Sequence, residues 1–233
     1  MPMLARFALT FAAAALVLTA QPPPFPRGGG PRFLGAEAGM PGRVVKNAPY
    51  SADMITETTQ ALPDGNRIHQ TITVHVYRDS EGRTRTEQPL SALGALAPGS
   101  DLPTVIFIHD PVAGANYALN PRNKTVTKSG WRQMGGRGGP RKGHSETLPK
   151  QTIEGLAAEG TRITQTIAAG EIGNEKPIES LTERWYSPDL QINLLVKQSD
   201  PRMGETVTRL VNINRSEPTK SLFEIPSDYK QSR

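Results

Sequence analysis

Hydrophobic and polar residues alternate along much of this chain, and the alternation is clearest in residues 179–197. A Ser-Pro-Asp-Leu sequence in the middle of this stretch is typical of a β-turn, because proline at the second turn position already has the required φ. Folding the chain about this turn sets Trp185 opposite Ile192. Further from the turn, it sets Leu181 opposite Val196. The stretch therefore predicts a β-hairpin with one apolar face. The residues predicted on that face are Leu181, Trp185, Leu190, Ile192, Leu194 and Val196.

The same alternation continues through most of the chain, interrupted by short turns rich in Asp, Asn, Pro and Gly. Besides the hairpin, strands are predicted at residues 49–62, 68–77, 83–87, 104–109, 116–119, 124–128, 151–157, 160–168 and 205–213. Short connections make neighbouring strands antiparallel. We therefore expect a mainly β fold, an antiparallel meander of about 10–11 strands that forms a curved sheet or half-open barrel. Few short helices are expected: one around residues 91–96, and a tail at 218–229 that is either helical or extended and is predicted to dock on the sheet.

Residues 1–20 have the pattern of a secretory signal peptide. Arg6 supplies a positive start, and an apolar run then ends at the small residue Ala20. A membrane anchor is the rival interpretation, but the run is shorter than the roughly 20 apolar residues that a bilayer requires, and prolines follow it directly. No cysteine follows the run, which excludes attachment of a lipid to a lipoprotein cysteine. We expect a periplasmic or secreted protein that does not span the membrane after the signal is cleaved.

The rest of the chain divides into a tether and one domain. Residues 21–43 are rich in proline and glycine and predict a flexible linker. Residues 44–229 are long enough for a single β domain, and because the chain has no cysteine, this domain must be held together by its core. Within the domain, clustered glycine in residues 129–150 predicts a flexible basic loop.

The positive charge of the chain is concentrated in that loop. The loop has five basic residues against one acidic residue, whereas residues 151–233 have ten against twelve. The folded body is therefore close to neutral, which argues against nucleic acid as a partner. The loop is interpreted as a solvated surface or as the contact for an anionic partner or lipid head group; its likeness to RNA-binding RGG segments leaves RNA as a further alternative. The residues predicted to contact a partner are Trp131, Arg132, Arg137, Arg141 and Lys142.

The sequence contains no recognisable catalytic or metal-binding motif. His69 and His75 share one strand face but lie roughly 20 Å apart along an extended strand, so they cannot hold one metal ion. The hairpin face carries one carboxylate, Glu183. A buried Glu183 could act as an acid or base with a raised pKa, or it could simply pair with a nearby base, and the second interpretation is favoured. We expect no enzymatic activity, no metal and no cofactor.

Two sets of short motifs resemble those of uncharacterised exported bacterial proteins. The first combines Pro-Tyr-Ser-Ala at 49–52, Asp-Gly-Asn-Arg-Ile at 64–68, Tyr-Arg-Asp at 77–79 and Gly-Arg-Thr-Arg at 82–85. The second combines Glu-Arg-Trp-Tyr-Ser-Pro-Asp-Leu at 183–190 with Leu-Phe-Glu-Ile-Pro-Ser-Asp-Tyr at 222–229. At fold level the pattern is similar to the LolA/LolB/RseB group of exported proteins, in which a meander forms a half-open barrel. No individual carrier residue of that group can be matched to this chain.

These observations predict a non-enzymatic envelope protein that binds a lipid, acyl chain or other apolar ligand against a concave β-sheet. The residues predicted to line that site are Ile72, Val74, Val76, Ile106, Ile108, Trp185, Ile192, Leu194 and Val196. The alternative for each of them is that it only fills the core. The alternative function is an envelope module for protein interaction or signalling, with the basic loop as its contact.

Overall fold

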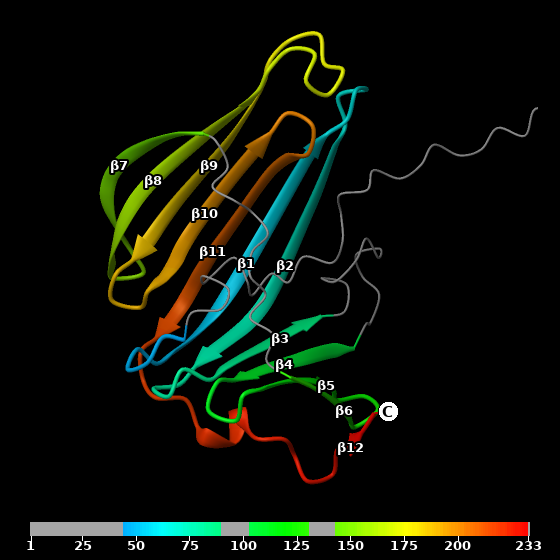
Figure 1. The fold of residues 1–233 in the computed structure, drawn as a ribbon, viewed down its shortest axis with the longest axis vertical. Helices are drawn as coiled ribbons and strands as arrows, with labels where there is room; N and C mark the ends of the chain where they lie inside the picture. Colours follow the sequence, from blue (N-terminus) through cyan, green and yellow to red (C-terminus); the bar gives the residue numbers. More distant parts are fainter. Residues whose placement is uncertain (1–43, 90–102, 131–142, 233) are drawn as a thin grey trace, which may run out of the picture. The chain divides into compact units, whose positions relative to one another are not determined.

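The computed structural model describes residues 44–89, 103–130 and 143–232 of the 233-residue chain. These residues form one twelve-stranded sheet in the order β12-β6-β5-β4-β3-β2-β1-β11-β10-β9-β8-β7 (Figure 1). Every pair of neighbours is antiparallel except β12 with β6, which is parallel. The two ends of the order, β12 and β7, are not neighbours, so the sheet is open. The expected mainly β, antiparallel fold is confirmed.

The strands are β1 (Tyr50–Ala61), β2 (Arg67–Arg78), β3 (Thr84–Pro89), β4 (Thr104–Asp110), β5 (Ala115–Asn120), β6 (Thr125–Gly130), β7 (His144–Ile153), β8 (Leu156–Ile167), β9 (Ile178–Ser187), β10 (Ile192–Asp200), β11 (Gly204–Asn214) and β12 (Lys230–Gln231). The order contains two meanders, β1 to β6 and β7 to β11. They meet where the first strand, β1, pairs with β11. A single 3-10 helix, η2 (Lys220–Phe223), is described in the tail.

The loop predicted at residues 129–150 is partly wrong. Ser129 is paired in β6, and β7 begins at His144 rather than at residue 151. The sequence pattern misses this start because β7 is the outermost strand and is exposed along most of its length, so its side chains need not alternate between apolar and polar. Residues 131–142 lie outside the described residues.

The main hairpin forms where predicted, but its register differs. Trp185 is opposite Leu195, and Ile192 is opposite Ser187. The connection is longer than a simple turn because residues 188–191 all lie outside the strands, and the register shifts again around Leu194 through a β-bulge. The expected pair of Leu181 with Val196 is therefore wrong: Leu181 is opposite Ser199 and is 39% exposed.

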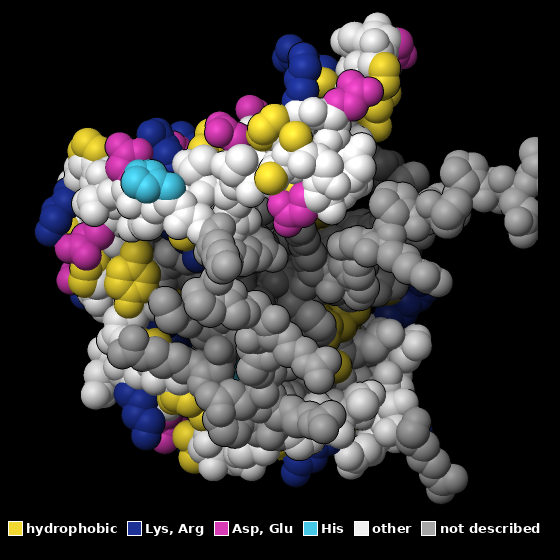
Figure 2. Space-filling model, turned by 45° about the horizontal axis from the view of Figure 1, so that its top comes forward, with side chains coloured by type: hydrophobic (Ala, Val, Ile, Leu, Met, Phe, Trp, Pro, Cys, Tyr) yellow, Lys and Arg dark blue, Asp and Glu magenta, His cyan; other side chains and the backbone are white. Residues whose placement is uncertain are grey.

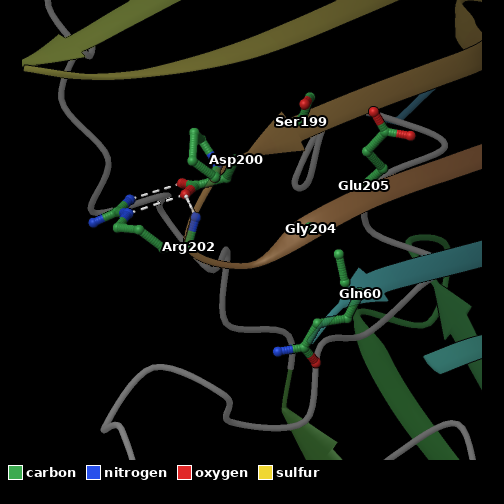
Figure 3. A pocket seen from close by; sticks show the side chains of 8 residues that line it. Gln60, Ser199, Asp200, Arg202, Gly204 and Glu205 are labelled. Carbon is green, nitrogen blue, oxygen red and sulfur yellow. Dashed lines mark hydrogen bonds and ion pairs between the residues drawn. The ribbon is translucent and has the colours of Figure 1, made fainter. Parts of the chain in front are cut away.

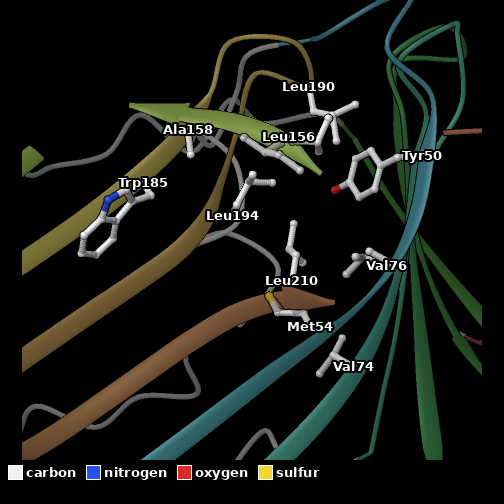
Figure 4. Close-up of a cluster of buried hydrophobic side chains, with 12 residues drawn as sticks. Tyr50, Met54, Val74, Val76, Leu156, Ala158, Trp185, Leu190, Leu194 and Leu210 are labelled. Atoms are coloured by element: carbon white, nitrogen blue, oxygen red, sulfur yellow. The ribbon is translucent and has the colours of Figure 1, made fainter. Parts of the chain in front are cut away.

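The main core is one cluster of buried side chains drawn from both meanders (Figure 4). It consists of Tyr50, Ala52, Met54, Val74, Val76, Leu156, Ala158, Trp185, Leu190, Ile192, Leu194 and Leu210. Strand β1 lies between the two meanders, and its Met54 is opposite both Val74 of β2 and Leu210 of β11. This pairing is what makes the core continuous across the junction of the meanders.

A second, smaller cluster lies on strands β4 to β6 and contains Ile106, Ile108, Leu119 and Val126. Tyr229 from the tail packs against it. Elsewhere in the tail, Phe223 is buried, and its ring lies 5.4 Å from the guanidinium carbon of Arg83. Arg85 Nη1 donates to the carbonyl oxygen of Leu222 at 2.8 Å. The prediction that the tail docks on the sheet is confirmed, whereas the helix expected at residues 91–96 lies outside the described residues.

Candidate functional site

Strands β2 and β3 form a fork in the sheet. They are paired only from His75 opposite Glu87 to Arg78 opposite Thr84, whereas β2 continues along β1 as far as Arg67. Figure 1 shows β3 leaving the side of β2 at this point. Strand β3 ends at Pro89, and proline has no N–H with which to continue the ladder along β2. The sequence thus ends the pairing of β2 with β3 and opens the fork.

Gln88 lies at the apex of this fork, one residue beyond the last pair between the two strands. Its side chain is almost completely buried, at 1% exposed, yet neither Oε1 nor Nε2 has a hydrogen-bond partner in the structure. A primary amide can donate two hydrogen bonds and accept two. Leaving such a group buried and unpaired costs about 1–3 kcal/mol, so buried polar groups in folded proteins almost always have partners. Among the described residues, only the Gln88 amide and the indole Nε1 of Trp185 are buried side-chain polar groups without a partner, and Gln88 is the one that lies at the fork.

The face around Gln88 is otherwise mostly apolar. Thr86 is opposite Val76 on one side and Phe107 on the other, and Gln88 is opposite Val105. Since side chains two residues apart point to the same side of a sheet, Gln88 shares a face with these three apolar residues. Val76 is buried, and Val105 and Phe107 are half-buried. We call Val76, Thr86, Gln88, Val105 and Phe107 the fork face.

The charged residues of β3 lie on the opposite side of the sheet. Arg85 Nε donates to Glu87 Oε1 at 2.6 Å, and both alternate with the residues of the fork face. Tyr77 is opposite Arg85, and burial raises the pKa of its hydroxyl, an effect to which the nearby Glu87 carboxylate adds. The fork face therefore carries three apolar side chains and two uncharged hydrogen-bonding ones, Thr86 and Gln88, and the Arg85–Glu87 ion pair lies on the other side of the sheet.

The nine residues predicted to line a ligand site are divided by the structure. Val74, Val76, Trp185, Ile192 and Leu194 are part of the main core, and Ile72 packs against it. Val196 is buried but is in neither cluster. Ile106 and Ile108 form the second cluster instead, so placing them on the same face as Val76 is wrong.

The error with Ile106 and Ile108 has a simple cause. The sequence of β4 is apolar at four consecutive positions and gives no alternation from which to choose a face. The pairing of Thr86 with both Val76 and Phe107 shows that Phe107 lies on the same face as Val76. Ile106 and Ile108 therefore lie on the opposite face. The sequence also gave no reason to single out Gln88, Val105 or Phe107.

The two sets of motifs that resemble exported proteins meet in the structure at Arg78. Its Nε donates to the carbonyl oxygen of Ala48 at 2.9 Å, and its Nη2 donates to that of Leu190. Its guanidinium carbon lies 4.8 Å from the centre of the Tyr50 ring, a cation–π arrangement. Burial lowers the pKa of Arg78 and raises that of Tyr50. These contacts give Arg78 a structural role, tying the start of β1 to the β9–β10 turn.

Glu183 behaves as the favoured interpretation predicts. Arg162, its neighbour on β8, donates to Glu183 Oε1 from Nε at 2.8 Å and also contacts Glu146 Oε2 at 3.3 Å. These carboxylates raise the pKa of Arg162, the hydrogen bond to Glu183 being the first cause. A carboxylate paired in this way has no need of a catalytic role.

The remaining polar features of the described residues lie at the surface. A surface depression of about 260 Å³ lies at the β10–β11 turn, lined by Gln60, Asp200, Arg202 and their neighbours (Figure 3). Its Asp200 carboxylate accepts hydrogen bonds from Arg202, which lower the pKa of Asp200. In the described ranges no three His, Cys, Asp or Glu side chains are grouped so as to hold a metal ion. His75 lies 2.6 Å from Asp53 Oδ1.

The surface agrees with the near-neutral charge of the folded body. Figure 2 shows acidic, basic and hydrophobic side chains interspersed on the visible face of the described residues. The predicted partner contacts Trp131, Arg132, Arg137, Arg141 and Lys142 all lie outside the described residues. Across the part of the chain that the structure describes, no helix has both the length and the apolar character needed to cross a bilayer.

Comparison with known proteins gives structural likenesses only. No protein-family model matches the sequence, and no curated protein matches it. The chain is similar in structure to MucB in the Pseudomonas aeruginosa MucA/MucB complex, with a TM-score of 0.47, 11% identity, and coverage of 79% of this chain and 58% of that one. An uncharacterised conserved protein from Thermus thermophilus gives a TM-score of 0.45, 12% identity, and coverage of 80% and 90%.

A LolA superfamily protein from Nitrosomonas europaea gives a TM-score of 0.35, 9% identity, and coverage of 82% and 94%. The group named by the sequence resemblance is thus found among the solved structures that this chain is similar to. The chain spans less than two thirds of the length of the MucB structures it matches. Because all of these TM-scores are below 0.5, the proposals below rest on this chain's own residues.

Proposed function

We propose that this chain is a non-enzymatic, exported envelope protein that binds an amphiphilic ligand on the fork face. The unpaired amide of Gln88 carries this proposal. The acyl part of the ligand would lie along Val76, Val105 and Phe107, and its polar head would exchange hydrogen bonds with Gln88.

The chemistry of the face favours an acyl lipid or fatty acid over a wholly apolar ligand. A hydrocarbon without a head group would leave both amide atoms of Gln88 unpaired, at the same cost as before binding. A carboxylic acid or hydroxyl head group can accept from Nε2 and donate to Oε1, and an ester carbonyl can accept from Nε2. The apolar neighbours supply contact area, and a few placed polar groups in an apolar site fix the orientation of a ligand.

Export to the envelope is part of the same proposal. It is supported by the sequence pattern of residues 1–20. The second candidate function, a module for protein interaction, is favoured by a different feature of the fork: β2 has no described strand on its outer side from Arg67 to Val74.

The experiment is a comparison of ligand uptake and stability in Gln88→Leu and Gln60→Leu. Gln60 is exposed near the end of β1 and serves as the control. We expect the wild-type protein to take up a fluorescent fatty acid in a saturable manner. Gln88→Leu should bind it about fivefold more weakly, since a lost hydrogen bond is worth about 1 kcal/mol.

The same substitution should leave the free energy of unfolding unchanged or raise it, because it removes a buried unpaired amide. Weaker binding together with equal or greater stability is the mark of a group kept for function. No uptake by the wild-type protein, or equal uptake by Gln88→Leu, would contradict the proposal. A large loss of stability in Gln88→Leu would show that the amide has a structural partner and would also contradict it.

A further inference from the structure

Within the described ranges, no strand covers the outer side of β2 between Arg67 and Val74, and we call this side the free edge of β2. From Arg67 to Val74, β2 is paired with β1 on one side and with no described strand on the other. Residues Arg67 to Thr71 and Thr73 are exposed. A free edge presents backbone N–H and C=O groups that can pair with another strand.

The β1–β2 hairpin fixes which groups point outward. Its closing bond runs from Leu62 N–H to the carbonyl oxygen of Asn66, and hydrogen-bonded pairs then alternate along the ladder. Even-numbered residues of β2 therefore bond to β1, and odd-numbered residues point away from it. In agreement, Arg67 N–H bonds to the Asn66 side chain rather than to β1. The outward groups left without a described partner are the N–H and C=O of His69, Thr71 and Thr73.

This edge lacks the protection that the two ends of the sheet have. Strand β12 contains only two residues. Strand β7 carries Pro149 and Lys150 at a register shift. Proline, lysine, bulges and short length are the devices by which proteins prevent edges from pairing. The free part of β2 has no proline, no bulge and only one formal charge, on Arg67, so nothing in its sequence opposes the addition of a strand.

We propose that the free edge of β2 binds an extended segment of a partner protein as an added strand. Only a backbone supplies donors and acceptors at the spacing of His69, Thr71 and Thr73, which excludes a lipid or a folded helix as the occupant. The free edge is short, because β3 is paired with β2 from His75 onward and blocks the edge at Glu87. A short edge bounded in this way favours an extended peptide over a second folded copy of this chain. This proposal is independent of a ligand at Gln88.

The side chains beside the edge indicate which segment would fit. Ile68 and Ile72 point to one side of β2, and Ile68 is 43% exposed. On the other side, His69 lies between Thr59 and Thr71, within 3.1 Å and 3.5 Å of their hydroxyl oxygens. The preferred segment therefore alternates, with β-branched apolar side chains facing the isoleucines and small polar ones facing the threonines.

The test uses amide hydrogen exchange of the full chain, with a short synthetic peptide of alternating valine and threonine capped by lysines. In the free protein, the amides of Gln70 and Ile72 should exchange slowly and those of His69, Thr71 and Thr73 quickly. Saturating peptide should slow the exchange of the His69, Thr71 and Thr73 amides by about tenfold or more. It should leave the exchange rates of Gln70 and Ile72 unchanged. Protection elsewhere, or no protection, would overturn the proposal.

Two variants at one position make the test specific. Thr71→Pro removes an outward N–H without breaking a bond to β1 and should abolish the protection of His69 and Thr73 by the peptide. Thr71→Ala keeps the N–H, so the peptide should still protect His69 and Thr73 in this variant. Equal binding by the two variants would overturn the proposal, and so would dimerisation of the free protein through β2, because that would make a second copy the occupant. If Thr71→Pro does not fold, His69→Pro and His69→Ala provide the same comparison.

Discussion

Arg78 donates a hydrogen bond from Nη2 to the carbonyl oxygen of Leu190, 112 residues further along the chain. This bond joins β2 of the first meander to the β9–β10 turn of the second. Its Nε bond to Ala48 fixes the segment before β1 at the same point. The guanidinium thus holds two carbonyl groups from distant segments, and its planar array of donors suits that task.

Replacing Arg78 should test this anchoring role. Arg78→Lys keeps the charge, but one ammonium cannot reach two carbonyls in the fixed geometry of a guanidinium. We expect it to lower the free energy of unfolding by about 2 kcal/mol, since a bond to a charged donor is worth about 1.5–3 kcal/mol. Arg67→Lys, at an exposed position, should change it by less than about 0.5 kcal/mol. Equal stability of the two variants in urea unfolding would show that the anchor contributes nothing.

Gly160 lies directly against Trp185. A Cβ atom at Gly160 would fall 2.9 Å from Trp185 Nε1 and 2.7 Å from Leu148 Cβ, too close for either contact. We expect Gly160→Ala to destabilise the protein by about 1–3 kcal/mol and to shift the fluorescence of Trp185, measured in a Trp131→Phe background. Gly130→Ala is the control, because a Cβ there meets nothing within 4 Å. An unchanged emission spectrum and stability in Gly160→Ala would contradict this packing.

Asp53 makes the stability of the fold sensitive to acid. The hydrogen bond from Asn212 Nδ2 at 2.8 Å, followed by the contact with His75, holds the pKa of Asp53 below its ordinary value of 3.8. A lowered pKa means that this stability is present above pH 3.8 and is lost as the pH falls through the folded-state pKa.

Asn212→Gly removes this hydrogen bond but suits the local backbone, since Asn212 has a φ of 56°. The variant should therefore raise the pKa of Asp53, measured by NMR titration of its carboxyl carbon. Its stability should also fall less steeply between about pH 4 and pH 2. The account of Asp53 is wrong if the carboxyl titrates at the same pH in both proteins.

The tail should contribute to stability mainly through Phe223. Its side chain is 4% exposed and lies under Arg83. Phe223→Ala should cost about 3–5 kcal/mol, the usual range for a buried phenylalanine. Ile225→Ala, at a side chain 37% exposed, should cost much less. A similar small loss in both variants, measured by chemical unfolding, would mean that the tail is not part of the folded core.

Much of this fold could be predicted because the strands that bury one side chain in two show that period directly. Val74 and Val76 alternate with polar residues, and both are buried on the face that this alternation predicts to be apolar. The face of Ile106 could not be predicted, since every residue around it is apolar and only pairing with β3 decides it. The register of Trp185 depends on the long turn and the bulge at Leu194, and neither has a distinct sequence signal.

The candidate site was harder to predict than the core. Gln88 occupies a polar stretch, Thr-Glu-Gln, that is typical of a solvent-exposed strand, and the sequence pattern does not show that its side chain is buried. The free edge of β2 could not be predicted from the sequence of β2 alone. Pro89 was the available signal, because a proline at the end of β3 stops its pairing with β2.

The most direct test of the proposed function is native mass spectrometry, with lipid extraction, of the mature protein purified from the envelope without detergent. The account predicts a stoichiometric acyl-lipid or fatty-acid adduct in the wild-type protein, reduced in Gln88→Leu and retained in Gln60→Leu. A protein that carries no adduct, and that takes up no added fatty acid, would contradict it.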